Sequence, residues 1–592
     1  MFLRFIKNKK TNERGKVKMK KHSGITLIAL VITIIVLLIL AGVTVVTLTG
    51  DNGLITKAYD AENQTEIAKE KEQISLAYTT MKLENEEDIE KREKIFQSQL
   101  DKYTGENKTK AYASSTSYII HFIDSNRVYT IDEKGNVFEE NAAIIKEDAV
   151  AGAFDGTGSE EDPYVIMSIE DLVYLANQVN SGANNYNSKW IELGKPLDFK
   201  SKLSYKDINT KYSYDEAKKS YVPNEKSETT LMELCTTEEG FIPIGTYQGN
   251  FDGKGYKITN IYENRNGPAG VFSSITDINS RKVHIKNLSV DGSIISKDGN
   301  AGGIAASCGG HFNMIIENCT NNAEIKGINA GGIIGYNRAA AYPNIKKCSN
   351  TGKITASEKA GGIVGYAYTL GNVEECINNG EIEGVYAGGI IGWNEAAGIT
   401  FDKCYNNSQV KGTHAGGIVG GLYIGSLRIW NCGVSSNSEI IGTNNAGGIL
   451  GNHSNYGTNY IYNSYVLGKI SGNNNIGGIC GNAYSRVYES GIRVKIENTY
   501  FGGNIEGGRN VGGIIGINSC DNLEKLSITN CYYINTISKG ISNAEKEGIT
   551  ALSEEDMKVN DALFNSLKSY TNNEHEISAW IKPSNQYPIH NN

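Results

Sequence analysis

Apolar and small residues recur at a nearly constant period through the second half of the chain. A Gly-Gly pair returns eight times within residues 285–548, at intervals of 29, 30, 27, 28, 31, 30 and 35 residues. Fixed periods of roughly 20 to 50 residues are typical of solenoids, propellers and other repeat arrays. The pairs begin at Gly302, Gly331, Gly361, Gly388, Gly416, Gly447, Gly477 and Gly512.

Each repeat also carries one β-branched residue, most often between polar neighbours. Such alternation predicts a strand whose aliphatic side chain points inward. Because the unit is short, it favours one coil of a solenoid over a four-stranded propeller blade. We therefore predict a mainly β fold, with a β-solenoid (β-helix) of about nine coils that extends about 45 Å. The β-branched positions are Ile325, Ile354, Ile382, Val410, Ile440, Ile470 and Ile505.

The N-terminal part has a different hydrophobic pattern, an unbroken apolar run. Ile25 to Leu48 comprise 24 residues without a charge, enough for a helix to cross about 30 Å of hydrocarbon. The 24 residues before the run carry nine Lys or Arg and one acid, Glu13. This asymmetry predicts a single-pass protein of a bacterial cell membrane, with a cytoplasmic N-terminus and an extracellular body. The expected anchor residues are Ile25, Leu27, Ile28, Leu30, Ile34, Leu37 and Leu40.

The segment Gly24-Ile25-Thr26-Leu27-Ile28-Ala29 resembles the N-terminus of type IV prepilins. The resemblance implies cleavage after Gly24 by a prepilin peptidase, methylation of Ile25, and other pilin subunits as partners. A body of more than 500 residues is bulky for lateral packing, and this favours a minor or tip position in a surface pilus or a related secretion pseudopilus, or a stand-alone anchored protein, over the major subunit. The family usually has Glu where this chain has Ala29, and that Glu pairs with the terminal amine of a neighbouring subunit; Ala29 likewise favours a position other than the major subunit. A plain membrane anchor is the alternative.

The region that follows predicts a pilin-like long helix and a small α+β region before the solenoid. Residues 54–83 and 88–103 are rich in helix-forming residues, and 118–123 and 127–131 predict two strands. The predicted divisions are a basic prepilin-type leader (1–24), a transmembrane helix (25–48), a pilin-like helix and sheet (49–145), an N-terminal cap with the first solenoid strands (146–284), the repeats (285–548) and a C-terminal cap (549–592).

Both caps contain recognisable helix signals. Ser168 is the expected N-cap of a helix over 169–179, and Ser553 begins a helix that ends near 567. Trp580 and Tyr587 are candidates for an exposed edge in the C-terminal cap. Residues 201–238 are polar and predict an insertion or long loop.

The segments 330–335, 360–365 and 415–420 share the pattern Ala-Gly-Gly-Ile-(Ile or Val)-Gly and resemble the GLUG-motif repeat. That resemblance implies a bacterial surface protein that acts in adhesion or surface interaction. The glycines predict either a positive φ or close backbone approach. A phosphate-binding loop is excluded because no Lys-Ser or Lys-Thr follows the glycines.

Composition agrees with a turn-rich β protein and argues against nucleic acid as a partner. The chain has 67 Gly against 8 Pro, and its net charge is −8. An acidic chain is a poor general binder of polyanions, so nucleic acid is not an expected partner.

Six of the ten cysteines occupy one phase of the repeat. Other coils have Leu288, Ser464 and Thr499 at this phase, which predicts a small inward position with free thiols; some disulfides are the alternative. No Cys-x-x-Cys or His-Glu-x-x-His string occurs, so no metal and no cofactor is expected. The six are Cys319, Cys348, Cys376, Cys404, Cys432 and Cys531.

Two sets of repeat positions bear on function. One set mixes both charge signs, which predicts stabilising pairs between coils and no catalytic residue. The alternative is a carbohydrate-active enzyme, which needs clustered carboxylates. The other set is aromatic and predicts either a binding edge for a host or environmental glycan or protein, or turn residues that cover the coil edge. The charged set is Glu324, Lys353, Glu381, Gln409, Glu439, Lys469 and Asn504; the aromatic set is Tyr336, Tyr366, Trp393 and Tyr423.

Overall fold

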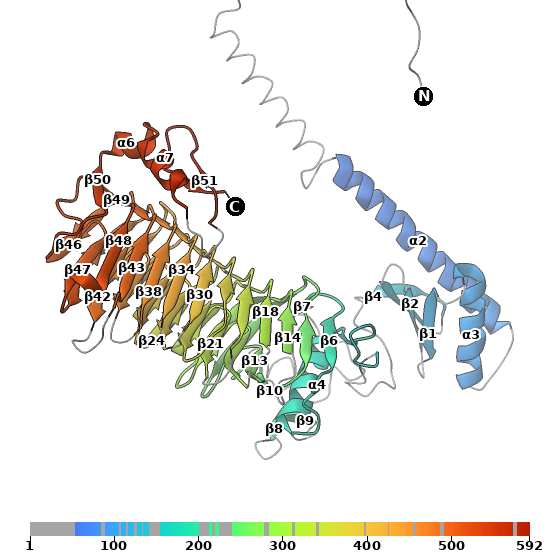
Figure 1. Cartoon of the computed structure of the whole chain (residues 1–592). Coiled ribbons are helices and arrows are strands. Elements are labelled where there is room, and N and C mark those ends of the chain that lie inside the picture. Colours follow the sequence, from blue (N-terminus) through green and yellow to red (C-terminus); the bar gives the residue numbers. More distant parts are fainter. Residues whose placement is uncertain are drawn as a thin grey trace, which may run out of the picture. The chain divides into compact units, whose positions relative to one another are not determined.

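The computed structural model (Figure 1) describes residues 54–140 and 154–591 and divides the chain into two compact units, Met1–Glu139 and Glu140–Asn592. The predicted leader and the 25–48 run, with Gly24 and Ile25, lie outside the described residues. Within the described ranges the gaps are 84–88, 106–107, 114–116, 123–126, 133, 155, 201–211, 216–219, 224–225, 227–238, 277–282, 311–313, 339–341, 396–397, 424–425, 454–456, 486–490 and 572–576.

The predicted single-pass membrane localisation is corrected. Across the described part of the chain, no helix is both long enough and apolar enough to span a membrane. The longest of these helices, α2 (Leu54–Lys82), has Asp, Glu and Lys on most of its turns. Its charges are expensive to place in hydrocarbon, whatever its length.

The first unit is a small α+β fold. Helix α2 and helix α3 (Ile89–Thr104) confirm the two predicted helices to within a residue or two. They accompany an antiparallel sheet in the order β1 (Thr109–Ala113), β2 (Ser117–Phe122), β3 (Arg127–Asp132) and β4 (Val137–Glu140). The rings of Tyr78, Phe96 and Tyr118 meet edge to face with centroids 4.9–6.0 Å apart and join the helices to the sheet.

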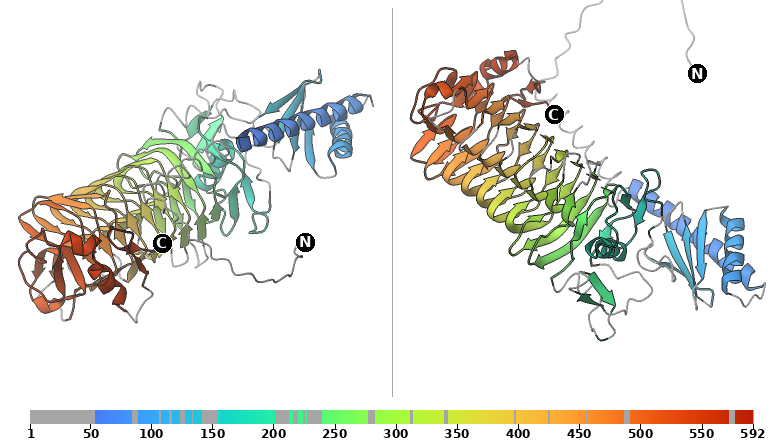
Figure 2. Two further views of the ribbon diagram at one scale, coloured as in Figure 1. Left: turned by 90° about the horizontal axis from the view of Figure 1, so that it is seen from above. Right: turned by 60° about the horizontal axis from the view of Figure 1, so that its bottom comes forward.

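The second unit is a stack of three-sided coils built from parallel strands (Figures 1 and 2), which confirms the predicted β-solenoid. Face 1 has ten strands among the described residues, close to the expected nine coils. They are β10 (Ile244–Tyr247), β13 (Phe272–Thr276), β17 (Ala305–Gly309), β21 (Ile334–Asn337), β25 (Val364–Ala367), β29 (Ile391–Asn394), β33 (Val419–Leu422), β37 (Leu450–His453), β42 (Cys480–Ser485) and β47 (Ile515–Cys520).

Face 2 follows face 1 in each coil, and its strands are also parallel and in register. They are β5 (Tyr164–Ile166), β6 (Trp190–Leu193), β11 (Asn250–Asp252), β14 (Val283–Lys286), β18 (Met314–Glu317), β22 (Asn344–Lys346), β26 (Val373–Glu374), β30 (Ile399–Asp402), β34 (Leu427–Trp430), β38 (Asn459–Tyr462), β43 (Val494–Glu497) and β48 (Leu526–Thr529).

Face 3 closes each coil, usually with a short strand and a longer one. Its strands are β7 (Leu197–Asp198), β12 (Lys257–Arg265), β15 (Ser289–Ser296), β16 (Ala301–Gly302), β19 (Thr320–Asn321), β20 (Glu324–Gly331), β23 (Ser349–Asn350), β24 (Ile354–Gly361), β27 (Ile377–Asn378), β28 (Ile382–Gly388), β31 (Tyr405–Asn406), β32 (Val410–Gly416), β35 (Gly433–Val434), β36 (Glu439–Gly447), β39 (Tyr465–Val466), β40 (Lys469–Gly472), β41 (Asn475–Gly477), β44 (Tyr500–Phe501), β45 (Ile505–Gly507), β46 (Asn510–Gly512), β49 (Cys531–Ile534) and β50 (Ile549–Leu552).

Helices and hairpins flank the coils. Helix α4 (Ile169–Asn180) confirms the predicted N-terminal helix, and the Ser168 hydroxyl accepts from the Asp171 N–H at 3.1 Å. The predicted insertion contains a hairpin of β8 (Tyr212–Asp215) and β9 (Ser220–Pro223). Ser553 caps a helix as predicted, because its hydroxyl accepts from the Asp556 N–H at 3.1 Å. The expected single helix to residue 567 is wrong: the chain forms α6 (Glu554–Lys558) and α7 (Ala562–Ser569) before the pair β51 (Trp580–Ile581) and β52 (Ile589–His590).

The predicted inward ladder of β-branched residues is confirmed. Neighbouring coils pair Ile325 with Ile354 and Ile354 with Ile382, and each of these side chains is almost fully buried. Only Ile505, near the end of the ladder, is partly exposed. The nine described cysteines carry free thiols. The cysteines at one phase of the repeat form a separate inward row. Burial raises the pKa of thiols in this row, such as Cys348 and Cys376, so these thiols are protonated and act as small apolar groups.

The Gly-Gly pairs mark a corner where neighbouring backbones approach closely. A Cβ on Gly331 would lie 2.0 Å from the Ile334 carbonyl oxygen, and one on Gly332 would lie 2.1 Å from the Gly362 oxygen. None of the eight first glycines has a positive φ in this structure. Close approach, and not a left-handed turn, is therefore the reason that glycine is required here.

A buried asparagine ladder runs beside that corner. The Nδ2 of Asn350 donates to Asn378 Oδ1 at 2.8 Å, and the Nδ2 of Asn378 donates to Asn406 Oδ1 at 2.7 Å. Asn378 also donates to the Gly380 carbonyl at 2.9 Å, so each amide bonds within its own coil and to the next. The ladder thus satisfies buried polar groups and holds neighbouring coils in register.

We expect Asn378→Ala to destabilise the solenoid by about 2–4 kcal/mol, because it leaves amide groups of Asn350 and Asn406 without their ladder partner. The midpoint of urea unfolding measures the loss. Asn379→Ala is the matched control: Asn379 is exposed on the adjacent position, and its replacement should change stability by less than about 0.5 kcal/mol. Equal effects of the two variants would contradict a special role for the ladder.

One carboxyl group interrupts the apolar interior. Glu263 lies opposite Ile294 of the next coil and is fully buried. Both its oxygens lie 3.2 Å from the Gly270 N–H. Burial raises the pKa of Glu263 well above its ordinary value of 4.5, although Arg265 and the Gly270 N–H oppose this. The folded state therefore holds this proton at pH values where the unfolded chain has lost it.

Because the folded pKa is raised, Glu263 contributes most stability below pH 4.5, and its contribution falls as pH rises toward the folded pKa, by up to about 1.4 kcal/mol per pH unit. We expect Glu263→Ile to remove this loss and to raise the melting temperature at pH 7 more than at pH 4. Calorimetry at both values tests this, with the exposed Glu161→Gln as control. A pH-independent difference from the unmodified protein would contradict the assignment.

Candidate functional site

The outward side of face 1 carries a compact group of aromatic and charged residues in its central coils. Tyr336, Tyr366 and Trp393 occupy one register, as the aromatic spacing predicted. Tyr423 does not share this register, because Gly421 lies opposite Trp393. We call this register the first column. A second column lies two residues further along each strand, on the same side, and contains Arg338, Tyr368, Glu395 and Tyr423. We call Tyr336, Arg338, Tyr366, Tyr368, Trp393, Glu395 and Tyr423 the aromatic patch.

Contacts within the aromatic patch separate its buried base from its exposed rings. The rings of Tyr336 and Tyr366 have centroids 4.9 Å apart, with planes inclined by 41°. Trp393 is only 8% exposed, and its Nε1 donates to Glu395 Oε1 at 3.2 Å. Tyr368 and Tyr423 are 43% and 40% exposed. The two tyrosines therefore offer ring surface to a ligand, whereas Trp393 supports the patch from below.

Two neighbours shape the space around Trp393. The Tyr386 ring lies with its centroid 4.2 Å from that of Trp393. A Cβ on Gly421 would lie 2.8 Å from the Trp393 ring, so glycine in the next coil leaves room for the indole. The indole position is thus determined by residues of three different coils.

The electrostatics of the patch keep the Tyr336 and Tyr366 hydroxyls protonated. Burial raises the pKa of Tyr366, and the neighbouring Glu395 raises it further. Burial also raises the pKa of Tyr336, partly opposed by Arg338. The Lys359 ammonium lies 5.0 Å from the centroid of the Tyr366 ring, in cation–π contact. The patch therefore combines hydrogen-bonding hydroxyls with one Arg and one Glu.

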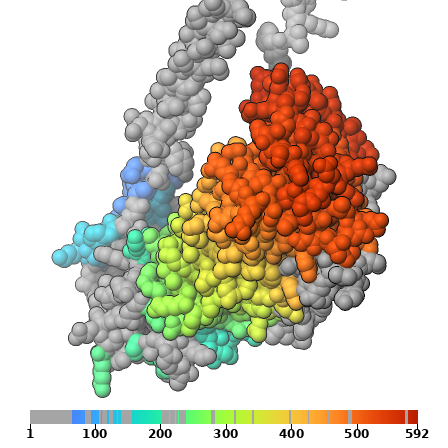
Figure 3. Space-filling model, turned by 90° about the vertical axis from the view of Figure 1, so that its left-hand side faces the viewer, coloured from blue at the N-terminus to red at the C-terminus, as the bar shows by residue number. Residues whose placement is uncertain are grey.

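A second aromatic column lies on face 3, but the chain itself covers it. Tyr465 and Tyr500 are in register and stack at 6.2 Å and 20°, and Tyr405 lies two coils before Tyr465. Residues 577–591, here called the strap, lie across this column. Figure 3 shows the C-terminal residues, in red, packed against the last coils.

Aromatic contacts and hydrogen bonds both hold the strap against the coils. Trp580 is 5% exposed and donates from Nε1 to Asn463 Oδ1 at 2.6 Å. The Nδ1 of His590 lies 3.1 Å from the Tyr405 hydroxyl. Burial lowers the pKa of His590 to about 3, so the imidazole is neutral at physiological pH. The predicted exposed edge at Trp580 is therefore wrong, and Tyr587 is likewise half-buried.

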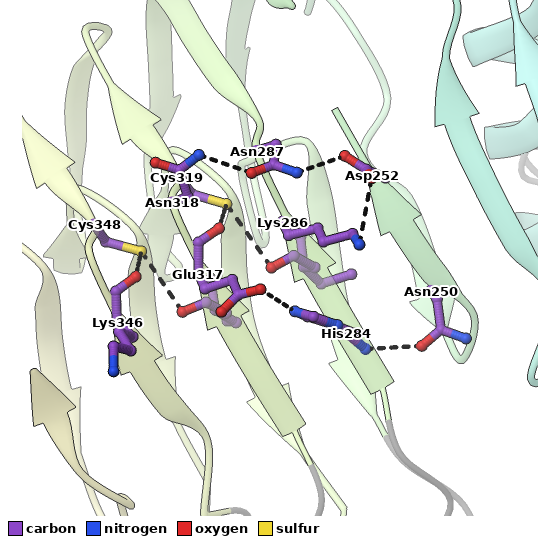
Figure 4. A network of polar contacts seen from close by, with 12 residues as sticks. Asn250, Asp252, His284, Lys286, Asn287, Glu317, Asn318, Cys319, Lys346 and Cys348 are labelled. Carbon is purple, nitrogen blue, oxygen red and sulfur yellow. Dashed lines mark hydrogen bonds and ion pairs between the residues drawn. The ribbon is translucent and has the colours of Figure 1, made fainter. Parts of the chain in front are cut away.

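Face 2 carries a polar network near its N-terminal end (Figure 4). The His284 Nε2 lies 2.9 Å from Glu317 Oε1, and the Lys286 Nζ lies 3.5 Å from Asp252 Oδ2. The Asn287 Nδ2 donates to Asp252 Oδ1 at 2.9 Å. Each carboxylate thus has its own cationic or amide partner, as in cross-strand ion pairs.

The charged repeat positions on face 3 behave in the same way. Lys353 lies 3.2 Å from Glu381 across neighbouring coils, and Lys469 lies 3.2 Å from Glu439. Gln409 donates to Glu439 at 3.1 Å. These contacts confirm pairing across neighbouring coils for five of the predicted positions, whereas Glu324 pairs with Lys326 of its own strand at 2.7 Å. Within the part of the chain that the structure describes, no group of three or more His, Cys, Asp or Glu is arranged to hold a metal ion.

Comparisons with known proteins add little to this geometry. No family model matches the chain, and no curated protein matches it. Among solved structures, the chain is similar to a Bacteroides ovatus protein provisionally assigned as an immunoglobulin A1 protease, at 17% identity over 74% of this chain and 94% of that protein. The TM-score is 0.29, so this likeness supports no argument about a reaction. The prepilin and GLUG resemblances stay predictions.

We expect Trp580→Ala to release the strap from face 3, because loss of a buried aromatic side chain costs about 3–5 kcal/mol. Hydrogen–deuterium exchange of residues 577–591 should accelerate, while exchange in the central coils stays slow. Ile581→Ala is the control, since Ile581 is 38% exposed on the same strand. Unchanged protection of the strap in Trp580→Ala would show that other contacts hold it.

Proposed function

We propose that the protein acts in adhesion or surface interaction and binds its ligand at the aromatic patch without catalysing a reaction. The observation that carries this proposal is the pair of exposed rings, Tyr368 and Tyr423, at 43% and 40% exposure beside the buried Trp393. Binding surfaces are often rich in such rings, because they supply large contact area at low conformational cost. The GLUG resemblance, which implies a bacterial surface protein, supports the same proposal.

The solenoid suits this role because it presents the aromatic patch on a rigid support. Each patch residue follows or lies within a strand that is hydrogen-bonded to the coils on both sides. Side chains on such a sheet lose little additional freedom when a ligand binds. Preorganisation of this kind improves affinity without additional contact area.

Binding is proposed in place of catalysis because of how the carboxylates are arranged. Asp252, Glu317, Glu381 and Glu439 are each engaged with a Lys, His or amide partner. A general acid or base needs a carboxyl group that converges with others on a substrate position. The contacts of these four groups favour a structural role.

We expect the double variant Tyr368→Ala/Tyr423→Ala to weaken adsorption of the full chain by about tenfold or more, since central binding rings often contribute over 1 kcal/mol each. The measurement is adsorption to immobilised mucin, fibrinogen and a panel of insoluble polysaccharides. Tyr256→Ala is the matched control, because Tyr256 is a 36% exposed tyrosine outside the patch. Undiminished binding by the double variant, or an equal loss in the control, would refute the proposal.

A further inference from the structure

The first column of the aromatic patch continues as an uncharged row through nine of the ten strands of face 1, and Ile517 occupies the tenth position on β47. Strand pairing aligns one outward residue from each coil, from Thr246 on β10 to Asn482 on β42. Hydroxyl side chains precede the rings, and a glycine and amide side chains follow them. The row reads Thr246, Ser274, Ser307, Tyr336, Tyr366, Trp393, Gly421, Asn452 and Asn482.

This row presents chemistry that repeats once per coil. Coils stack about 4.8 Å apart, so the nine positions extend over about 38 Å. Hydroxyl and amide groups both donate and accept hydrogen bonds, and the Tyr336 and Tyr366 rings add apolar stacking surface. Trp393 and Asn452 are each only 8% exposed and support the row from within; Asn452 accepts from Asn482 at 3.0 Å. A ligand that matches the row must therefore be long, must repeat at a similar spacing, and must carry both hydroxyl groups and apolar faces.

The charges beside the row point to a neutral ligand. Arg338 and Glu395 flank it in the second column, and their opposite charges offset one another. The Lys359 ammonium beside the Tyr366 ring is likewise offset, because it forms an ion pair with Glu358. Glu395 is also engaged by the Trp393 indole at 3.2 Å. Neither a polyanion nor a polycation would gain a net attraction from this pair.

We infer that face 1 binds a neutral linear polysaccharide that lies parallel to the solenoid axis, with sugar rings on the aromatic patch and hydroxyls along the flanking Ser and Asn positions. This inference rests on the proposed function, because it assigns the ligand class of the same patch. A chain of this kind meets every requirement of the row: length, repetition, hydroxyl groups and apolar ring faces.

The test begins with the full chain on an array of neutral polysaccharides, uronate-containing polysaccharides and deglycosylated proteins. A neutral polysaccharide should bind best, and its oligosaccharides should bind more tightly with length, by about tenfold or more from two to eight sugars. Preference for uronates or for deglycosylated protein, or binding to none of the arrayed polysaccharides, would overturn the inference.

Variants near the two ends of the row test whether the ligand extends along it. Ser274→Ala and Asn482→Ala should each weaken binding of the octamer about threefold or more and leave the trimer unchanged. Asn407→Ala, an exposed amide on face 3, is the control. If octamer and trimer bind equally but Tyr368→Ala/Tyr423→Ala still abolishes binding, the extended site is wrong and the proposed function survives. If the tyrosine variant binds normally, the proposed function itself fails.

Discussion

Close backbone contact at the glycine corner is the constraint on which the rest of the solenoid depends. A Cβ at either glycine of the pair would overlap a carbonyl oxygen, at 2.0 Å for Gly331 and 2.1 Å for Gly332. The corner can therefore turn tightly enough for faces 1 and 3 to meet, and for the asparagine ladder to reach from coil to coil. Once the coils are in register, every outward position on a strand becomes one member of a row.

That register explains why aromatic residues are covered in one row and exposed in another. The tyrosines of the face 3 column lie beneath the strap, where Trp580 and His590 pack on their rings and cover them. The aromatic patch on face 1 retains exposed rings at Tyr368 and Tyr423. The chain thus uses one aromatic column to fasten its own C-terminal residues and leaves the other open to a ligand.

Periodicity in the sequence was enough to predict the fold of the second unit and part of the candidate site. Tyr336, Tyr366 and Trp393 could be assigned to one row because their spacing equals the repeat. Arg338, Tyr368 and Glu395 were missed, although each lies two residues after a predicted aromatic and shares its side of the strand. Strand alternation would have found them. No comparable rule reveals that Trp393 is buried, since that depends on Gly421 and Tyr386 in other coils.

By itself, the sequence determined the mainly β class, the coil period, the inward aliphatic and cysteine rows, and the helices at 54–82, 89–104 and 169–180. These features depend on interactions between residues that are near in sequence or one repeat apart. Tertiary structure alone decided the path of the strap, which brings His590 to Tyr405 across 185 residues. It also decided that close backbone approach, and not a positive φ, requires glycine at the Gly-Gly pairs, and that Glu263 is buried. Both features depend on which atoms of other segments occupy the adjoining space.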